Sequence, residues 1–244
     1  MTAARFLAEP AALAGEVIHL DGPEGRHAAA VRRLRPGERI DLTDGHGQVV
    51  CGTVTAVGPD WVDVRAESRV AVPAPKPWLV VVQALVKADA GERAVASMVE
   101  VGVDEIVPWP AARSVVRWEG VRGEKSLQRW RATAQEAAKQ SRRAWLPVVG
   151  DPCTPGTLTT RVRNAALAVV LHESATGPLA AQRLPTAGDL LLIVGPEGGI
   201  APEEIDQLAA AGAQVCRLGP TVLRTSTAAT AAAAVVLAGC GRWG

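Results

Sequence analysis

A buried strand that runs directly into a glycine-rich turn is the feature that most constrains how this chain folds. Residues 190–200 read LLLIVGPEGGI, and the three glycines let the backbone turn sharply and expose its N–H groups. Pro202 and the two glutamates after it indicate the start of a helix. A strand, a glycine turn and a helix N-terminus in this order are typical of a ligand site in an α/β protein. A second loop of this kind, residues 217–229, follows.

The region around these loops alternates between strand-like and helix-like segments. This alternation predicts an α/β fold with a parallel sheet and helices on both of its faces. The expected strands are 78–85, 105–109, 114–118, 166–172, 189–194 and 214–218, and the expected helices are 89–101, 124–143, 203–211 and 226–238.

The first part of the chain has a different pattern. Short strand-like pieces separated by turns predict a small β-barrel, a type of domain that often holds oligonucleotides. Three prolines within residues 73–77 predict a stiff linker. The expected organisation is therefore a domain at 1–72, a linker at 73–77 and a second domain at 78–244. The pieces that build the first domain are strands at 17–20, 39–43, 49–57 and 61–66 and one helix at 24–34.

Positive charge is concentrated in two segments although the net charge is only +1. Residues 113–143 carry nine Lys or Arg against three Glu, and residues 24–39 carry five Arg against two Glu. Such asymmetry favours a nucleic-acid-binding face. The alternative for either segment alone is an ordinary solvated surface.

Several classes of protein find no support in the sequence. The four cysteines and four histidines are scattered, with no CxxC pair, so we expect no metal site and reduced thiols in a cytoplasmic protein. No segment indicates a signal peptide or a membrane span. The phosphate-binding motifs GxxxxGK[ST] and GxGxxG and the hydrolase motif GxSxG are absent. Kinases, NTPases, dinucleotide-binding enzymes and hydrolases therefore lose support.

Three strand ends are expected to form one pocket, at residues 171–173, 195–199 and 218–220. Backbone amides and carbonyls would dominate its lining. That lining suits a ligand with an adenine edge and an amino-acid part, such as S-adenosylmethionine, better than a polyphosphate.

Several motifs together resemble one known family. They are His27, VRRLRPG at 31–37, EAAKQSR at 136–142, GPEGG at 195–199 and LGPTVLRT at 218–225. The chain resembles the bacterial 16S ribosomal RNA uracil-N3 methyltransferases of the SPOUT superfamily. It departs from their pattern at Ser226, where the family often has Glu, and at Ala90 and Ser97, where it usually has lysines.

The resemblance implies a fold that general rules do not predict, because knots are nearly absent from proteins and periodicity alone predicts an open sheet. It implies a C-terminal SPOUT α/β domain with a deep trefoil knot, preceded by a small PUA/OB-like β-barrel. It also implies a homodimer, the cofactor S-adenosylmethionine bound at the knot, and small-subunit ribosomal RNA as partner.

The candidate site residues follow from these motifs. Glu197, the only acid in the glycine turn, and Arg224 are the expected catalytic residues; alternatively Glu197 caps the next helix and pairs with Arg224. The expected cofactor contacts are Leu171, Val194, Gly195, Gly199, Leu218, Gly219 and Leu223. The expected RNA contacts are His27, Arg33, Arg113, Arg129, Arg131, Gln140 and Arg142.

Two other functions remain open at this point. One is a knotted methyltransferase that acts on another RNA or on a ribose 2′-hydroxyl. The other is a non-catalytic RNA-binding assembly factor.

Overall fold

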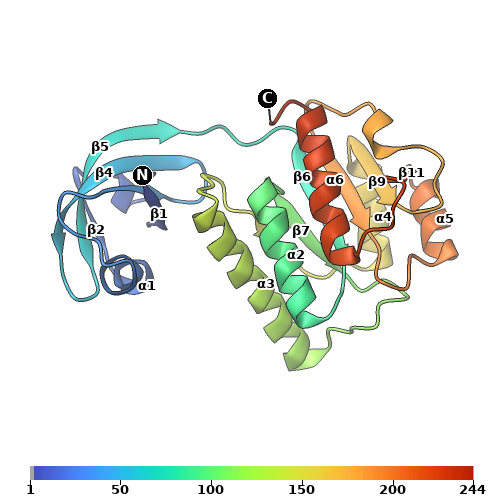
Figure 1. The fold of residues 1–244 in the computed structure, drawn as a ribbon, viewed down its shortest axis with the longest axis horizontal. Helices are drawn as coiled ribbons and strands as arrows, with labels where there is room; N and C mark the ends of the chain where they lie inside the picture. Colours follow the sequence, from blue (N-terminus) through green and yellow to red (C-terminus); the bar gives the residue numbers. More distant parts are fainter. Residues whose placement is uncertain (1–2, 244) are drawn as a thin grey trace. The chain divides into compact units, whose positions relative to one another are not determined.

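The computed structural model describes residues 3–243 (Figure 1). Contacts divide the chain into two compact units. The first unit contains the chain up to residue 74 together with residues 138–146, and the second unit contains residues 75–137 and the chain from residue 147 onward. The sequence analysis assigned all of 78–244 to the second domain and did not predict that residues 138–146 return to the first unit.

The first unit is built on a five-stranded sheet. Its hydrogen-bonded order is β1-β3-β4-β5-β2, with β1 parallel to β3 and the other neighbours antiparallel. Alternate residues such as Ile40 and Leu42 are buried, which is the pattern of a sheet with one face on a core. The strands are β1 (Ala4–Leu7), β2 (Val17–Leu20), β3 (Arg39–Thr43), β4 (Gln48–Val57) and β5 (Val62–Ala71). The helical segments are η1 (Ala12–Ala14), α1 (Gly22–Arg26) and η2 (His27–Val31).

The second unit is a six-stranded, wholly parallel sheet in the order β11-β9-β10-β6-β7-β8. The strands are β6 (Trp78–Ala84), β7 (Glu105–Trp109), β8 (Val148–Val149), β9 (Leu167–Leu171), β10 (Asp189–Val194) and β11 (Gln214–Cys216). The helical segments are α2 (Ala88–Val101), α3 (Gly120–Gln140), α4 (Pro155–Asn164), η3 (Leu179–Ala181), α5 (Pro202–Ala210) and α6 (Thr225–Gly239).

Helices cover both faces of this parallel sheet, as the alternating pattern predicted. Val80 and Val82 of β6 share one core with Leu158 of α4 and Leu208 of α5. The other face is covered by α6, which packs on β6 and β10, and α2 lies beside α6 (Figure 1). The strands read as nearly continuous apolar runs because both of their faces are buried.

One predicted strand, 114–118, is wrong. This segment is irregular and follows a turn in which the Ser114 N–H donates to the Ala111 carbonyl, and the Arg117 guanidinium donates to the Ala111 and Ala112 carbonyls. Both edges of β7 are already paired, with β6 and β8, so this segment has no place beside β7. Val115 is accordingly 80% exposed.

Smaller corrections concern element boundaries and short elements. The long basic helix α3 begins at Gly120 and ends at Gln140, not at 124 and 143. The predicted helix at 24–34 is a short α-helix followed by a π-helical turn. The sequence interpretation missed β1, β8 and α4 because each is short or lacks a clear apolar period.

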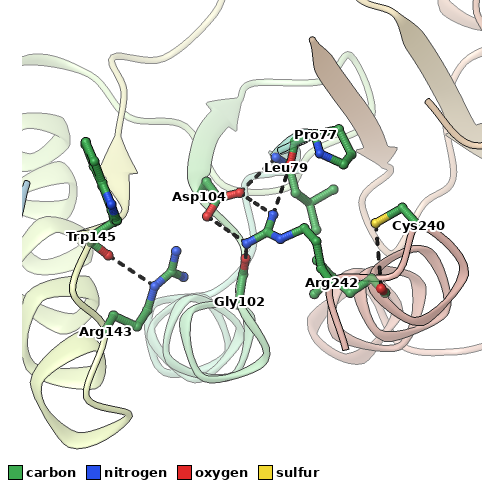
Figure 2. Close-up of polar contacts among 9 residues, drawn as sticks. Pro77, Leu79, Gly102, Asp104, Arg143, Trp145, Cys240 and Arg242 are labelled. Atoms are coloured by element: carbon green, nitrogen blue, oxygen red, sulfur yellow. Dashed lines mark hydrogen bonds and ion pairs between the residues drawn. The ribbon is translucent and has the colours of Figure 1, made fainter. Parts of the chain in front are cut away.

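A buried ion pair fixes the end of the chain in the second unit (Figure 2). The fully buried Asp104 carboxylate accepts hydrogen bonds from the two terminal nitrogens of Arg242, Nη1 and Nη2. It also accepts the Leu79 N–H at 2.9 Å. Arg242 also donates to the carbonyls of Pro77 and Gly102, each at 3.2 Å. These bonds tie the residues after α6 to the beginnings of β6 and β7.

The returning segment 138–146 adds to the loop between β3 and β4 in the first unit. Ala144 O accepts from Gly47 N at 3.0 Å, and Leu146 N donates to Gly45 O at 2.8 Å. Both glycines have positive φ, and a Cβ would lie 2.7 Å from Leu146 Cδ1 at Gly45 and 2.8 Å from Trp145 Nε1 at Gly47. Only glycine therefore lets the loop and the returning segment approach so closely.

Candidate functional site

A large cavity lies at the carboxyl ends of the parallel strands of the second unit, where α/β proteins bind ligands. Its volume is about 570 Å³, within the range of small-molecule sites. It is lined by residues that follow β9, by the glycine turn after β10, by the loop before α6 and by two residues of α2.

The glycine turn has its shape because side chains cannot be accommodated in it. Gly199 has φ +73°, a left-handed conformation that favours glycine. A Cβ on Gly195 would lie 2.5 Å from Cγ1 of Ile200. The turn closes through the Gly199 N–H, which donates to the Pro196 carbonyl at 2.9 Å.

A neighbouring loop braces this turn through Glu204. One Glu204 carboxylate oxygen accepts the Ala112 N–H at 2.8 Å, and the other accepts the Ala201 N–H at 3.1 Å at the start of α5. Arg113 donates to the Gly198 carbonyl at 3.4 Å. Glu204 thus performs the helix capping that was the alternative role for Glu197.

Glu197 and Arg224 line the cavity and are both exposed. Among residues 3–243, neither side chain has a hydrogen-bond or ion-pair partner, so the alternative in which they pair with each other is wrong in this structure. Both groups are therefore available to a ligand.

The structure brings together the residues predicted to hold the cofactor and to act in catalysis. All nine line the one cavity: Leu171, Val194, Gly195, Glu197, Gly199, Leu218, Gly219, Leu223 and Arg224. Their individual roles stay predictions.

Three further titratable side chains in the cavity wall were not among the individually predicted site residues. Arg93 comes from α2, and His172 and Glu173 follow β9. The His172 ring nitrogen Nδ1 lies 2.8 Å from Ser174 Oγ, which fixes the orientation of the ring. The strand-end position of 171–173 was a signal for His172 and Glu173, but no local pattern indicated Arg93.

Six of the seven predicted RNA contacts fall into three groups, and Arg33 belongs to none of them. His27, Gln140 and Arg142 line a second, small cavity in the first unit. Arg113 lies at the glycine turn, whereas Arg129 and Arg131 lie on α3. The group on α3 is partly engaged, because Arg131 bonds the Asp151 carboxylate at 2.9 Å and the Val149 carbonyl at 3.1 Å.

Arg33 and Arg142 share an unusual backbone conformation. Both have positive φ, +54° and +55°, directly after helical segments where glycine is the relaxed choice. A left-handed conformation costs about 1–2 kcal/mol in a residue with a Cβ. Arginine therefore occupies both positions in spite of backbone strain.

Neither a metal cluster nor a membrane span is found in the described part of the chain. Residues 3–243 contain no group of three or more His, Cys, Asp or Glu placed to hold a metal ion. No helix among them is both long and apolar enough to cross a bilayer. Burial raises the pKa of Cys153 to about 11, so that thiol is protonated at neutral pH.

Comparisons with known proteins agree with this geometry. A family model described as an RNA methyltransferase domain matches residues 73–237, and one described as an RNA methyltransferase PUA domain matches residues 20–67. Ribosomal RNA small subunit methyltransferase E of Mycobacterium tuberculosis is 44% identical, with 100% of this chain and 94% of the relative covered. The Bacillus subtilis protein of the same name is 30% identical over 86% of this chain and 85% of its own length.

Solved structures show the same fold over nearly the whole chain. A Legionella pneumophila protein described as a methyltransferase, with the cofactor SAM bound, has a TM-score of 0.84 and 28% identity, with 98% of both chains covered. Ribosomal RNA small subunit methyltransferase E from Neisseria gonorrhoeae has a TM-score of 0.81 at 24% identity, with 97% of this chain and 98% of that chain covered.

Proposed function

The chain belongs to the ribosomal RNA small subunit methyltransferase E family of RNA methyltransferases, and we propose that it methylates N3 of a uracil in 16S ribosomal RNA. S-Adenosylmethionine is the methyl donor in this proposal. The observation that carries it is the large cavity of the second unit, which gathers nine predicted residues from three distant segments of the chain.

The cavity fits this cofactor on structural grounds. Gly219 lines it, and a Cβ built there meets no protein atom within 4 Å, so the space beside Gly219 is available to a ligand. Leu171, Val194 and Leu218 supply apolar surface, while the turn at 195–199 supplies backbone donors and acceptors. This combination suits an adenosyl group with an amino-acid tail.

The cofactor would supply a methyl group already activated on a sulfonium, and the chain's own residues would prepare the acceptor. Uracil N3 carries a proton and is a poor nucleophile until that proton is removed. Glu197 would accept the N3 proton, and Arg224 would stabilise the negative charge that develops on a ring oxygen. Positioning of the ring would contribute much of the rate enhancement.

The assembly and fold of the SPOUT family belong to the same proposal. We propose a homodimer whose C-terminal segment forms the trefoil knot, acting in the cytoplasm where ribosomal RNA is made. Val222, 79% exposed, and Val115 offer apolar surface for a subunit contact. Light scattering of the purified protein tests the dimer.

The experiment that tests the function begins with Gly219→Ala. The added methyl group meets no protein atom, so the fold should be unchanged while affinity for S-adenosylmethionine, measured by calorimetry, falls at least about tenfold. The matched control is Gly177→Ala, which also meets no atom within 4 Å and lies outside the cavity lining. Equal affinity in both variants would remove Gly219 from the cofactor site.

The substrate is tested by mass analysis of ribosomal RNA nucleosides from cells with and without the gene. The proposal expects 3-methyluridine in 16S RNA to be lost without the gene. A missing 2′-O-methyl group, or a missing methyl group in another RNA, would support the related knotted enzymes instead. Wild-type protein that binds RNA but not the cofactor would be an assembly factor.

A further inference from the structure

We propose that the small cavity of the first unit binds one backbone phosphate of the substrate RNA; this inference rests on the proposed function. We call it the cationic cavity. It has a volume of about 70 Å³. A cavity of this size suits one small anion and is small for a small-molecule binding site. It is lined by Ala4, Arg5, Phe6, His27, Arg32, Lys139, Gln140 and Arg142.

The charges around the cavity favour an anion. Four of its eight lining residues are Lys or Arg, and no carboxylate is among those eight. His27 and the Gln140 amide add further hydrogen-bonding groups. Because arginine presents several donors in a planar fork, it suits the oxygens of a phosphodiester better than the edge of a neutral base.

Two of the four cations, Lys139 and Arg5, are held in place before any ligand arrives by ion pairs with Glu24 and Asp41, which offset part of their charge. Lys139, with 4% of its side chain exposed, lies 2.7 Å from Glu24, whose other oxygen accepts the Leu7 N–H at 3.1 Å. Arg5 bonds the Asp41 carboxylate at 3.0 Å and donates to the Arg142 carbonyl. Since these side chains are already ordered, binding would cost little side-chain entropy.

One buried donor in the cavity wall lacks an acceptor. Arg5 Nε is buried and has no hydrogen-bond partner within residues 3–243. Buried polar groups in native proteins are almost always satisfied, by protein, water or an ion. A phosphate oxygen in the cavity would become its acceptor after a small shift of the Arg5 side chain, because Nε is closed off from solvent in this structure.

The return of the chain at 138–146 completes the cavity. This segment contributes three of the eight lining residues, and Arg142 holds its left-handed conformation there. Glycine would adopt that conformation without strain. An arginine at this position is explained if its side chain is needed for the ligand.

The test compares two single substitutions in the full-length protein. Arg32→Ala removes a cation that lines the cavity, whereas Arg26→Ala removes an exposed arginine of α1 that does not. Binding of a 16S RNA fragment is measured by fluorescence anisotropy over a range of salt concentrations. We expect Arg32→Ala to weaken binding and to lower the salt slope by about one unit relative to Arg26→Ala, the value for one lost phosphate contact.

The outcomes separate this proposal from the proposed function. Equal slopes for the two variants would overturn the cationic cavity as a phosphate site. Weaker binding of Arg32→Ala with an unchanged slope would also overturn it, because that result indicates a contact to a base. S-Adenosylmethionine affinity, melting temperature and methylation by the wild-type protein are measured in parallel. The proposed function would be refuted if the wild-type protein did not methylate 16S RNA, whatever the salt slopes of the two variants.

Discussion

The two cavities of this protein are built in opposite ways. The large one, about 570 Å³, is shaped by glycines and backbone turns at the ends of parallel strands. The cationic cavity, about 70 Å³, is walled largely by charged side chains. The first depends on the absence of side chains at a few positions, whereas the second depends on the presence of charge.

The two cavities should therefore respond differently to substitutions in their walls. A pocket walled by main chain loses its shape when one glycine gains a side chain, so its response should be nearly all-or-none. A cavity walled by several cations should lose affinity in steps of one contact.

Gly199→Val should abolish cofactor binding. Valine at φ +73° is strained, and its branched side chain adds bulk at the turn, so we expect a loss of affinity for S-adenosylmethionine of about 100-fold or more. Calorimetry measures this loss, and circular dichroism checks that the fold persists. Normal cofactor binding would show that the large cavity does not depend on this turn.

Glu197→Gln should lower turnover by about 100-fold at neutral pH if Glu197 accepts the N3 proton. The loss should shrink at high pH, because more of the uracil is then already ionised. Single-turnover methyl transfer across pH measures both effects. A pH-independent loss would assign Glu197 to binding and not to proton removal.

Arg224→Lys should lower turnover by roughly tenfold, because lysine keeps the charge but loses the planar pair of donors. The cofactor dissociation constant should change little, since the interaction is strongest in the transition state. A loss of cofactor affinity equal to the loss of turnover would place Arg224 among the cofactor contacts.

Arg129→Ala together with Arg131→Ala should lower the salt slope of RNA binding by about one unit, less than two contacts would give. Arg131 is already engaged by Asp151 and the Val149 carbonyl, so we expect it to contribute less than Arg129. Anisotropy titrations measure the slope. An unchanged slope would show that Arg129 and Arg131 lie on an ordinary solvated surface of α3. RNA binding would then have to come from other residues, such as those of the first unit.

Arg33→Gly should leave stability unchanged or raise it by up to about 1 kcal/mol, since glycine relieves the strain at φ +54°. RNA affinity should nevertheless fall if the side chain contacts RNA. Arg35→Gly is the control, because Arg35 does not have a positive φ and glycine there should lower the melting temperature. A lower melting temperature for Arg33→Gly would give Arg33 a structural role.

The predicted parts of the fold are those with a strong local signal. Apolar runs such as 190–194 predicted buried parallel strands, and β10 lies there with the predicted bounds. The Val-Val pair at 115–116 gave a similar local signal and was misleading, because strand formation also requires a free edge of the sheet. That requirement is tertiary and cannot be read from a window of residues.

The candidate site was predictable where its residues follow strands directly, and less so elsewhere. Arg93 reaches the large cavity from a helix whose sequence gives no sign of it. The sequence analysis gave the capping alternative to Glu197 in the loop, whereas the structure shows that Glu204 in the first turn of α5 performs it. The Asp44–Gly47 segment read as an ordinary turn, although its glycines accommodate a segment about 100 residues away.

Because residues 138–146 belong to the first unit, neither unit is a continuous segment of the chain. The chain passes between the two units at 74/75, 137/138 and 146/147, so no single cut separates them. A fragment that ends at the proline-rich linker would lack three of the residues that line the cationic cavity and the partner of the Gly45 and Gly47 backbone. The first unit of such a protein therefore cannot be transplanted as one contiguous stretch of sequence.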